Sequence, residues 1–384
     1  SKLTVRNLPW YAKLFGGIIG AATEAKHHAA DSFCGVGNQE ILDSWTATQL
    51  AYISLLGERP TAASLLPLQV ILGLIISNGV GTISSVDLRR RHADLMAQTA
   101  HLDKEPDARE RINAANLIAL DREIRAAREA AQGQGWIAVN VMKALSAYEA
   151  YVRQALQSGA NALVVGAGLP LDLPELAREH PDVALIPILS DARGVQLLVR
   201  KWEKKGRLPD AIVIENPRLA GGHLGAAKVT DLGDARFDFE VVIPQVREFF
   251  RQAGYERDIP LIAAGGIDSH ADILRLQGLG AAGVQLGTAF AVTQECDASE
   301  VFKNILAQAK PQDLVEFTSV AGLPARAVRT PWLDKYLRIL PVLQARAHPK
   351  AKCNMSFDCL QTCGLRDGIS GIGQFCIDQQ LGHA

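Results

Sequence analysis

The sequence predicts an α/β fold: a (β/α)8 TIM barrel with an inserted segment after strand 1 and a C-terminal helical, cysteine-containing extension. Two observations predict this class. From residue 80 onward, short apolar runs alternate with amphipathic helical patterns, which is typical of a parallel sheet with crossover helices. The chain has 384 residues, of which 48% are hydrophobic and 21% are charged, so it can bury one large barrel and an appendage.

Seven expected strands follow residue 79, and each is a short run of mainly aliphatic residues. They are residues 80–86, 137–142, 162–168, 184–190, 211–215, 261–267 and 284–290. Helical patterns separate them, as at residues 114–131, where one apolar stripe runs among charged residues. A closed barrel then requires an eighth strand before residue 80.

Two apolar runs compete for that first strand. Residues 70–76 lie too close to residue 80, because a parallel crossover needs roughly a dozen residues or more. Residues 12–18 fit better, since residues 64–77 then become the first crossover helix. Residues 20–61 would form an insertion on the catalytic face of the barrel, either a lid or subunit contact or a packing arm without chemistry.

We therefore expect the (β/α)8 barrel over residues 1–296, a helical extension over residues 297–348 and a cysteine-rich tail over residues 349–384 that packs on the barrel. The tail holds four cysteines with the spacing C-x5-C-x3-C-x12-C, namely Cys353, Cys359, Cys363 and Cys376. Four thiolates can bind zinc or an iron–sulfur cluster. Thiols that pack the tail without a metal fit the spacing equally well.

Composition excludes several classes of partner. The 40 basic and 41 acidic residues are mixed along the chain, which disfavours nucleic acid and an anionic membrane surface. The longest apolar stretch, residues 62–77, contains Pro67 and Gln69 and is shorter than the roughly 20 residues that cross a bilayer. We expect a cytoplasmic enzyme with a small-molecule substrate, and a homo-oligomer is compatible with the sequence.

Two glycine-containing strand ends predict a phosphate site. Residues 261–267 contain Gly265 and Gly266, and residues 283–290 contain Gly287 and Thr288. In a (β/α)8 barrel the loops after strands seven and eight commonly bind phosphate. Glycine there lets an anion approach backbone N–H groups.

Other strand ends carry weaker signals. The amide of Asn140 can hydrogen-bond the edge of a heteroaromatic ring, or it can tie two loops together. Gly166 begins Gly-Ala-Gly-Leu-Pro, which would let a planar ring lie against the backbone or would simply make a tight turn. Ser190 ends the fifth strand without a visible base or acid beside it, so we do not expect a nucleophilic serine.

His223 is the strongest catalytic candidate. It follows Gly221 and Gly222 in the segment Ala-Gly-Gly-His-Leu-Gly, just beyond the sixth strand. Imidazole titrates near neutral pH, which suits abstraction of a proton from carbon. An isolated histidine is usually structural, but one between glycines on the catalytic face of a barrel favours function.

Taken together, the motifs of residues 79–384 resemble the nitronate monooxygenase family, once called 2-nitropropane dioxygenases. These are FMN-dependent (β/α)8 barrels, and the family also includes NAD(P)H:quinone reductases and an FMN-dependent enoyl-acyl-carrier-protein reductase. The matching pieces are Asn140-Val-Met142, Gly166-Ala-Gly-Leu-Pro170, Ala220-Gly-Gly-His-Leu-Gly225, Ala263-Ala-Gly-Gly-Ile267, Gly283-Val-Gln-Leu-Gly-Thr288 and Glu295-Cys-Asp-Ala-Ser299.

The resemblance implies roles for individual residues. The FMN phosphate would be held by Gly265, Gly266, Gly287 and Thr288. Asn140 would contact the flavin, and His223 would act as a base or lie beside the substrate. Gly16 and Gly17 would lie against the isoalloxazine ring, with Ile18 where the family has methionine. The expected cofactor contacts are completed by Gly166, Ser190, Gly221 and Gly222.

The expected function is therefore oxidation of alkyl nitronates or nitroalkanes by O2 on FMN, with His223 as the catalytic residue. One alternative is an NAD(P)H-dependent flavin reductase of quinones or enoyl thioesters. A second is a barrel that binds a phosphorylated metabolite without flavin.

Overall fold

The computed structural model describes eleven segments of the chain. They are residues 32–33, 36–37, 88–100, 102, 107–130, 136–220, 222–223, 225–255, 259–293, 300–319 and 324–345. Several predictions lie outside these residues: the strands at 12–18 and 80–86, the helix at 64–77, most of the insertion at 20–61, and Gly16, Gly17, Gly221 and the four tail cysteines. Within the insertion, β1 (Ser32–Phe33) pairs antiparallel with β2 (Val36–Gly37).

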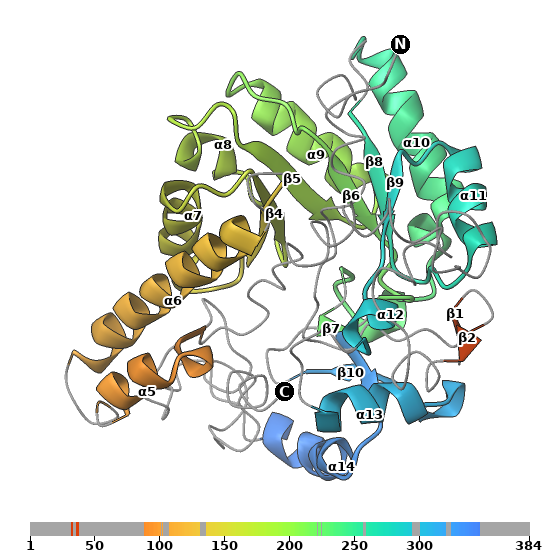
Figure 1. Cartoon of the computed structure of the whole chain (residues 1–384). Coiled ribbons are helices and arrows are strands. Elements are labelled where there is room, and N and C mark those ends of the chain that lie inside the picture. Colours follow the sequence, from red (N-terminus) through yellow and green to blue (C-terminus); the bar gives the residue numbers. More distant parts are fainter. Residues whose placement is uncertain are drawn as a thin grey trace, which may run out of the picture.

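A six-stranded parallel sheet forms the centre of the fold, in the order β3-β4-β5-β6-β8-β9 (Figure 1). Every neighbouring pair in it is parallel. The strands are β3 (Ala138–Met142), β4 (Ala162–Gly166), β5 (Ala184–Leu189), β6 (Ile212–Glu215), β8 (Leu261–Ala264) and β9 (Gly283–Gln285). All six lie where the alternating apolar runs predict strands.

Three of these strands end earlier than their apolar runs suggest, and the backbone explains each case. After β4, Ala167 and Gly168 adopt positive φ of 54° and 130°. After β8, Gly265 and Gly266 do the same. The strand predicted at residues 284–290 is too long: β9 ends at Gln285, and a short helix, α12 (Thr288–Ala291), follows.

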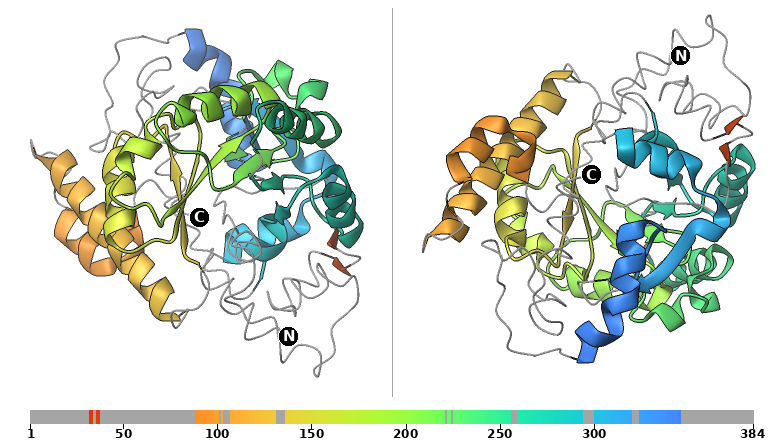
Figure 2. Two further views of the ribbon diagram at one scale, coloured as in Figure 1. Left: turned by 90° about the horizontal axis from the view of Figure 1, so that it is seen from above. Right: turned by 90° about the horizontal axis from the view of Figure 1, so that it is seen from below.

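Helices cover the outer side of the sheet, as the views from above and below show (Figure 2). The helices that follow the strands are α7 (Tyr148–Gln157), α8 (Leu173–Leu176), α9 (Ala192–Glu203), α10 (Phe239–Gln252) and α11 (His270–Leu279). They are preceded by η2 (Leu88–Arg91), α5 (Ala93–Thr99) and α6 (Ala108–Ala130), and two short turns, η4 (Val229–Asp231) and η5 (Ala235–Phe237), lie before α10.

The pleat of the strands separates two buried layers. Outward residues such as Val139, Leu185 and Ile212 pack with the helices in one core cluster. Inward residues, among them Val164 and Ala264, form a second cluster. Side chains alternate between the faces of a strand, so the inward positions at the carboxyl ends of the strands are where a barrel presents its functional groups.

The segment after residue 299 contains a β-hairpin that the sequence pattern does not predict. Between α13 (Glu300–Gln308) and α14 (Pro331–Ala345) lie η6 (Pro311–Asp313), β10 (Leu314–Thr318) and β11 (Pro324–Val328). The prediction of a purely helical extension over residues 297–348 is therefore wrong, because a β-hairpin lies between its two helices. Strand β11 pairs antiparallel with β7 (Gly222–His223), a hundred residues earlier; such non-local pairing is invisible in a local pattern.

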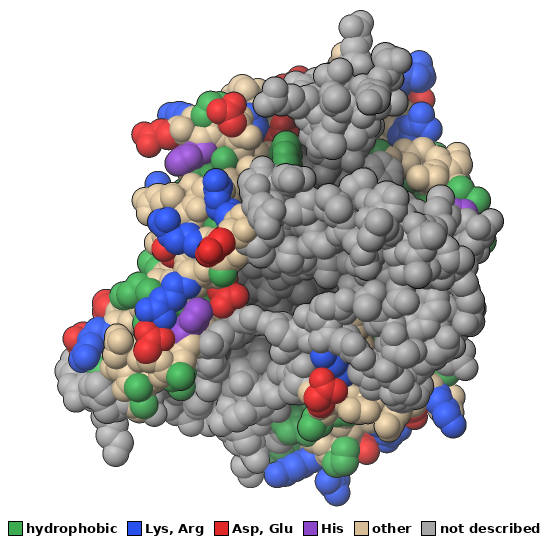
Figure 3. All heavy atoms as spheres, viewed as in Figure 1, with side chains coloured by type: hydrophobic (Ala, Val, Ile, Leu, Met, Phe, Trp, Pro, Cys, Tyr) green, Lys and Arg blue, Asp and Glu red, His purple; other side chains and the backbone are tan. Residues whose placement is uncertain are grey.

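The outer surface mixes charges of both signs. In the view of Figure 3, basic and acidic side chains alternate over the described helices at the left. Arg122 pairs with Asp94, and Arg125 with Asp121. None of the helices within the described segments is both long and apolar enough to cross a membrane.

Candidate functional site

The carboxyl ends of the parallel strands bring most of the predicted site residues to one edge of the sheet. Asn140 lies in β3, Gly166 ends β4, Ser190 follows β5 and Gly265 follows β8. Strands β7 and β10 and helix α12 lie on the side to which the strand arrows point (Figure 1). The structure therefore collects these residues and the start of the extension on one face.

The turn after β8 depends on glycine. Gly265 has a φ of 92° and Gly266 a φ of 80°, a region that other residues rarely adopt. A Cβ on Gly265 would lie 3.1 Å from both the Ala220 nitrogen and the Asn216 oxygen. Gly265 is thus needed for close packing of the β8 turn on the loop after β6, a different reason from the anion approach that the sequence suggests.

Asn216 organises the loop that leads from β6 toward His223. Its side chain is only 4% exposed, and its Oδ1 accepts a hydrogen bond from the Arg218 nitrogen at 3.0 Å. Its backbone nitrogen donates to the Ala264 oxygen at 2.9 Å, and its backbone oxygen accepts from Leu219 and Ala220. The loop is therefore folded back against β8 before it reaches β7.

Strand β7 contains Gly222 and His223. In the register with β11, His223 lies opposite Ala325 and Gly222 lies opposite Arg326. The backbone of the predicted catalytic residue is thus a strand of the sheet β10-β11-β7. Its position depends on the extension as well as on the barrel.

Ser190 packs under the same loop. It is 9% exposed, and a Cβ built on Gly225 would lie 1.9 Å from the Ser190 Oγ. The serine side chain therefore fills the space that a larger residue at 225 would need. Contact between Ser190 and a cofactor stays a prediction.

The loops after β3 and β4 are joined by Lys143. Its backbone nitrogen donates to the Gly166 oxygen at 2.8 Å, and its Nζ lies 2.7 Å from an Asp172 oxygen. The same ammonium group lies 3.9 Å above the ring of Tyr148. Burial, and then the charge of Asp172, raises the pKa of the Tyr148 hydroxyl, so this tyrosine stays protonated at neutral pH.

Gln285 is a buried amide that the sequence analysis did not select. It is 4% exposed and lies opposite Ala264 in the parallel register, so it belongs to the inward face. Among the residues that the structure describes, its Oε1 has no hydrogen-bond partner. A buried acceptor costs free energy unless a donor satisfies it, which fits a bound group with N–H or O–H donors. A lone polar residue inside the apolar run 283–290 was the available signal.

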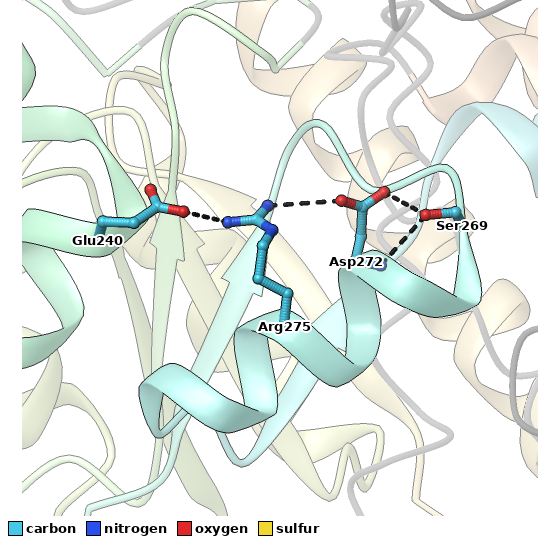
Figure 4. Close-up of polar contacts among 4 residues, drawn as sticks. All are labelled: Glu240, Ser269, Asp272 and Arg275. Atoms are coloured by element: carbon cyan, nitrogen blue, oxygen red, sulfur yellow. Dashed lines mark hydrogen bonds and ion pairs between the residues drawn. The ribbon is translucent and has the colours of Figure 1, made fainter.

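A carboxylate pair lies beside the β8 turn. One residue, Ile267, separates Asp268 from the two glycines. Burial, together with a hydrogen bond from its carboxyl group to Asp272, raises the pKa of Asp268 to about 6. Burial opposes ionisation of Asp272 as well, but hydrogen bonds from Ser269 and Asp268 outweigh it and lower the pKa of Asp272. Figure 4 shows Ser269, Asp272, Arg275 and Glu240 in one chain of polar contacts.

A pocket of about 910 Å³ lies elsewhere, between α10 and α11. Its lining includes Arg247 of α10 and also Pro260 and Ala282, which directly precede β8 and β9. It contains none of the predicted site residues.

Metal binding by the tail remains a prediction. Where the structure describes the chain, no three His, Cys, Asp or Glu side chains are grouped so that they could hold a metal ion. The four cysteines lie outside that part.

The parallel sheet and its covering helices define a protein of the (β/α)-barrel class. A family model described as nitronate monooxygenase matches residues 91–371, well over half of the chain. The chain therefore belongs to the nitronate monooxygenase family, which confirms the predicted resemblance and the barrel fold class. The described residues supply six of its strands.

Two curated relatives match a shorter stretch. A probable nitronate monooxygenase of Staphylococcus saprophyticus is 33% identical over 129 residues, which cover 32% of this chain and 33% of the relative. One of Bacillus subtilis is 31% identical over 126 residues, covering 33% of this chain and 34% of the relative. The matched stretch thus spans about a third of the length of these relatives.

Among solved structures, FabK from Thermotoga maritima is similar with a TM-score of 0.45 and 23% identity. The similarity covers 68% of this chain and 81% of FabK.

Proposed function

We propose that this protein is an FMN-dependent oxidoreductase that oxidises alkyl nitronates or nitroalkanes with O2. Membership of the nitronate monooxygenase family supports the class of reaction. The observation that carries the proposal is the placement of His223 in β7, on a loop that packs directly on the glycine turn after β8. The proposed proton acceptor and the proposed anion-binding turn thus belong to loops that pack on each other at one edge of the sheet.

Two features support FMN binding by the proposed residues. At the phosphate end, Gly265 and Gly266 form a turn with positive φ and carry no side chains that would keep an anion from the backbone. Gly287 and Thr288, at the start of α12, would complete the phosphate contacts. On the inward face of β9, the buried Oε1 of Gln285 would accept a hydrogen bond from the cofactor.

Further contacts belong to the same proposal and are less directly supported. They are Asn140, Gly166, Ser190, Gly221 and Gly222, with Gly16 and Gly17 against the ring. When bound, FMN would supply the two-electron chemistry and the reaction with O2, which no side chain can provide.

The work of the protein would be to move one proton. A neutral His223 imidazole would take the α-proton of a nitroalkane; the electrons of the C–H bond would pass to the nitro group, leaving a nitronate anion beside an imidazolium. A positioned general base of this kind contributes roughly 10²- to 10⁴-fold to the rate. A preformed nitronate has already lost this proton, so it does not need the base.

The substitution His223→Ala tests this role. We expect the variant to keep FMN, to lose about 10²-fold or more in turnover of a neutral nitroalkane, and to lose much less on the preformed nitronate. His180→Ala is the matched control, because His180 lies before β5 at the amino end of the strands. Equal losses on both substrates would argue against a base.

A spectrum and an anaerobic reduction test the wider proposal. The purified protein should be yellow, and a colourless protein that cannot be reconstituted with FMN would support the flavin-free phosphometabolite alternative. Under anaerobic conditions a nitronate should bleach the flavin. Rapid bleaching by NADPH without bleaching by a nitronate would establish the NAD(P)H-dependent alternative instead. An additional iron–sulfur absorbance would bear on the tail cysteines.

A further inference from the structure

The second sheet of the molecule contains a buried cation. Arg326 of β11 is 8% exposed and lies opposite Gly222 of β7. Because Gly222 has no side chain, no side chain of β7 stands directly opposite Arg326 in the register. Its Nη1 donates a hydrogen bond to the backbone oxygen of Arg218, a residue of the loop that joins β6 to β7.

Among the described residues, no carboxylate forms an ion pair with this guanidinium. Glu316 of β10 lies opposite Arg326 in the hairpin register and is exposed. Within the described segments, Arg326 forms no ion pair at 4.0 Å or less, and its Nε has no hydrogen-bond partner. Burial lowers the pKa of Arg326, Arg218 lowers it further, and Glu316 opposes the change.

Such a residue is costly for stability alone. Burying a guanidinium without a paired carboxylate is unfavourable, and an apolar side chain would serve a purely structural strand better. The hydrogen bond that Arg326 makes instead is to a loop carbonyl four residues before Gly222. Together with the β7–β11 pairing, this bond holds the loop at two places, on either side of Gly221.

We propose that Arg326 is a positioning residue for His223, which fixes the loop between β6 and β7 through the Arg218 carbonyl so that the imidazole meets the substrate in the geometry for proton transfer. This inference rests on the proposed role of His223 as a base. Arg326 acts through the loop, because it lies opposite Gly222 in the register and donates its hydrogen bond to the Arg218 carbonyl.

The test compares Arg326→Met and Arg326→Lys in the full-length FMN-loaded protein. We measure turnover of a neutral nitroalkane and of its preformed nitronate, and express the result as the ratio of the two. Arg326→Met should lower this ratio about tenfold or more, since small misplacements of a reacting group cost up to 10²-fold. Arg326→Lys keeps a donor and a charge and should recover part of the loss. Flavin content should stay the same.

Arg329→Met is the matched control, because Arg329 follows the same strand but forms an exposed pair with Asp334. Its ratio should equal that of the unsubstituted protein. An equal loss on both substrates in Arg326→Met, or the same fall in Arg329→Met, overturns the inference.

A variant that does not fold and a failure of the proposed base are distinguished from a failure of the positioning role. If Arg326→Met does not fold, Arg326→Gln replaces it, and an unchanged ratio in that variant overturns the inference while a fall of threefold or more supports it. If His223→Ala itself shows no selective loss, the proposed base fails; if His223→Ala shows the loss and the Arg326 variants do not, only the positioning role fails.

Discussion

At the scale of single residues, Gly265 is required by the conformation and packing of the backbone, independently of any ligand. Its φ of 92° and the 3.1 Å approach to two backbone atoms of the β6 loop both require the absence of a Cβ. The sequence predicts a glycine-dependent turn there. It could not predict the partner, because the contacting loop lies some 45 residues earlier in the chain and only the folded barrel brings the two together.

Gly265→Ala should therefore destabilise the fold and weaken FMN binding. The left-handed backbone alone costs an alanine about 1–2 kcal/mol, and the contacts with Ala220 and Asn216 add to it. Gly206→Ala is the matched control: Gly206 has a φ of 73° but nothing within 4 Å of the added Cβ. Thermal melting with and without FMN should show the larger loss, and the loss of FMN stabilisation, only at Gly265. Equal shifts would contradict the packing explanation.

At the scale of elements, the start of α11 combines a helix cap with the Asp268–Asp272 pair. Ser269 caps the helix by accepting the Asp272 backbone N–H at 3.1 Å. Because the native pKa of Asp268 is raised from 3.8 to about 6, the folded state holds a proton that the unfolded state releases. The stability from this proton is present below about pH 4 and is lost as the pH rises toward 6.

Asp268→Asn should remove that loss. The variant should gain on the unsubstituted protein between pH 4 and pH 7, by about 1 kcal/mol after solvent screening of this half-exposed group is allowed for. Asp272, whose pKa is lowered partly by the hydrogen bond from Asp268, contributes in the opposite direction, and the amide of the variant can still donate that bond. Thermal melting at several pH values checks this, with Asp238→Asn as the control, since exposed Asp238 forms no side-chain cap. A pH-independent difference would contradict the shared proton.

Among the elements, the sequence predicts the six parallel strands correctly but not the hairpin. The six parallel strands were predictable because buried parallel strands are continuous apolar runs between helical patterns. The hairpin β10–β11 was not, because Glu316 and Arg326 interrupt its apolar pattern, and its stability comes from pairing with β7 and packing on α14. Asn216, Gln285 and Arg326 were missed for the same reason: their importance lies in tertiary contacts.

At the scale of the whole molecule, the extension is joined to the barrel by a continuous series of contacts. The Tyr336 hydroxyl of α14 donates to the Thr318 oxygen of β10 at 2.9 Å, and its ring stacks on Trp332 and meets Phe317 edge-on. Strand β10 pairs with β11, and β11 with β7. Helix α14 is thus connected to the loop of the predicted base through two strands.

Tyr336→Phe should loosen this connection without removing the ring. Loss of the hydrogen bond removes a donor from the partly buried Thr318 oxygen and costs about 1 kcal/mol. Hydrogen exchange of the backbone amides of β11 and β7 should accelerate. Tyr255→Phe, at the end of α10, is the control and should leave those amides unchanged. An unchanged exchange rate in β7 for Tyr336→Phe would falsify the mechanical link between α14 and the site.

The β7–β11 pairing also has a consequence for biosynthesis. A nascent chain that has reached residue 293 already contains all six described strands of the central sheet, yet the strand that flanks His223 is still to be translated. The site can become complete only after residue 328 has left the ribosome and the hairpin has closed. A chain that ends before residue 324 would therefore lack the strand that pairs with β7, and with it the register that holds the backbone of His223.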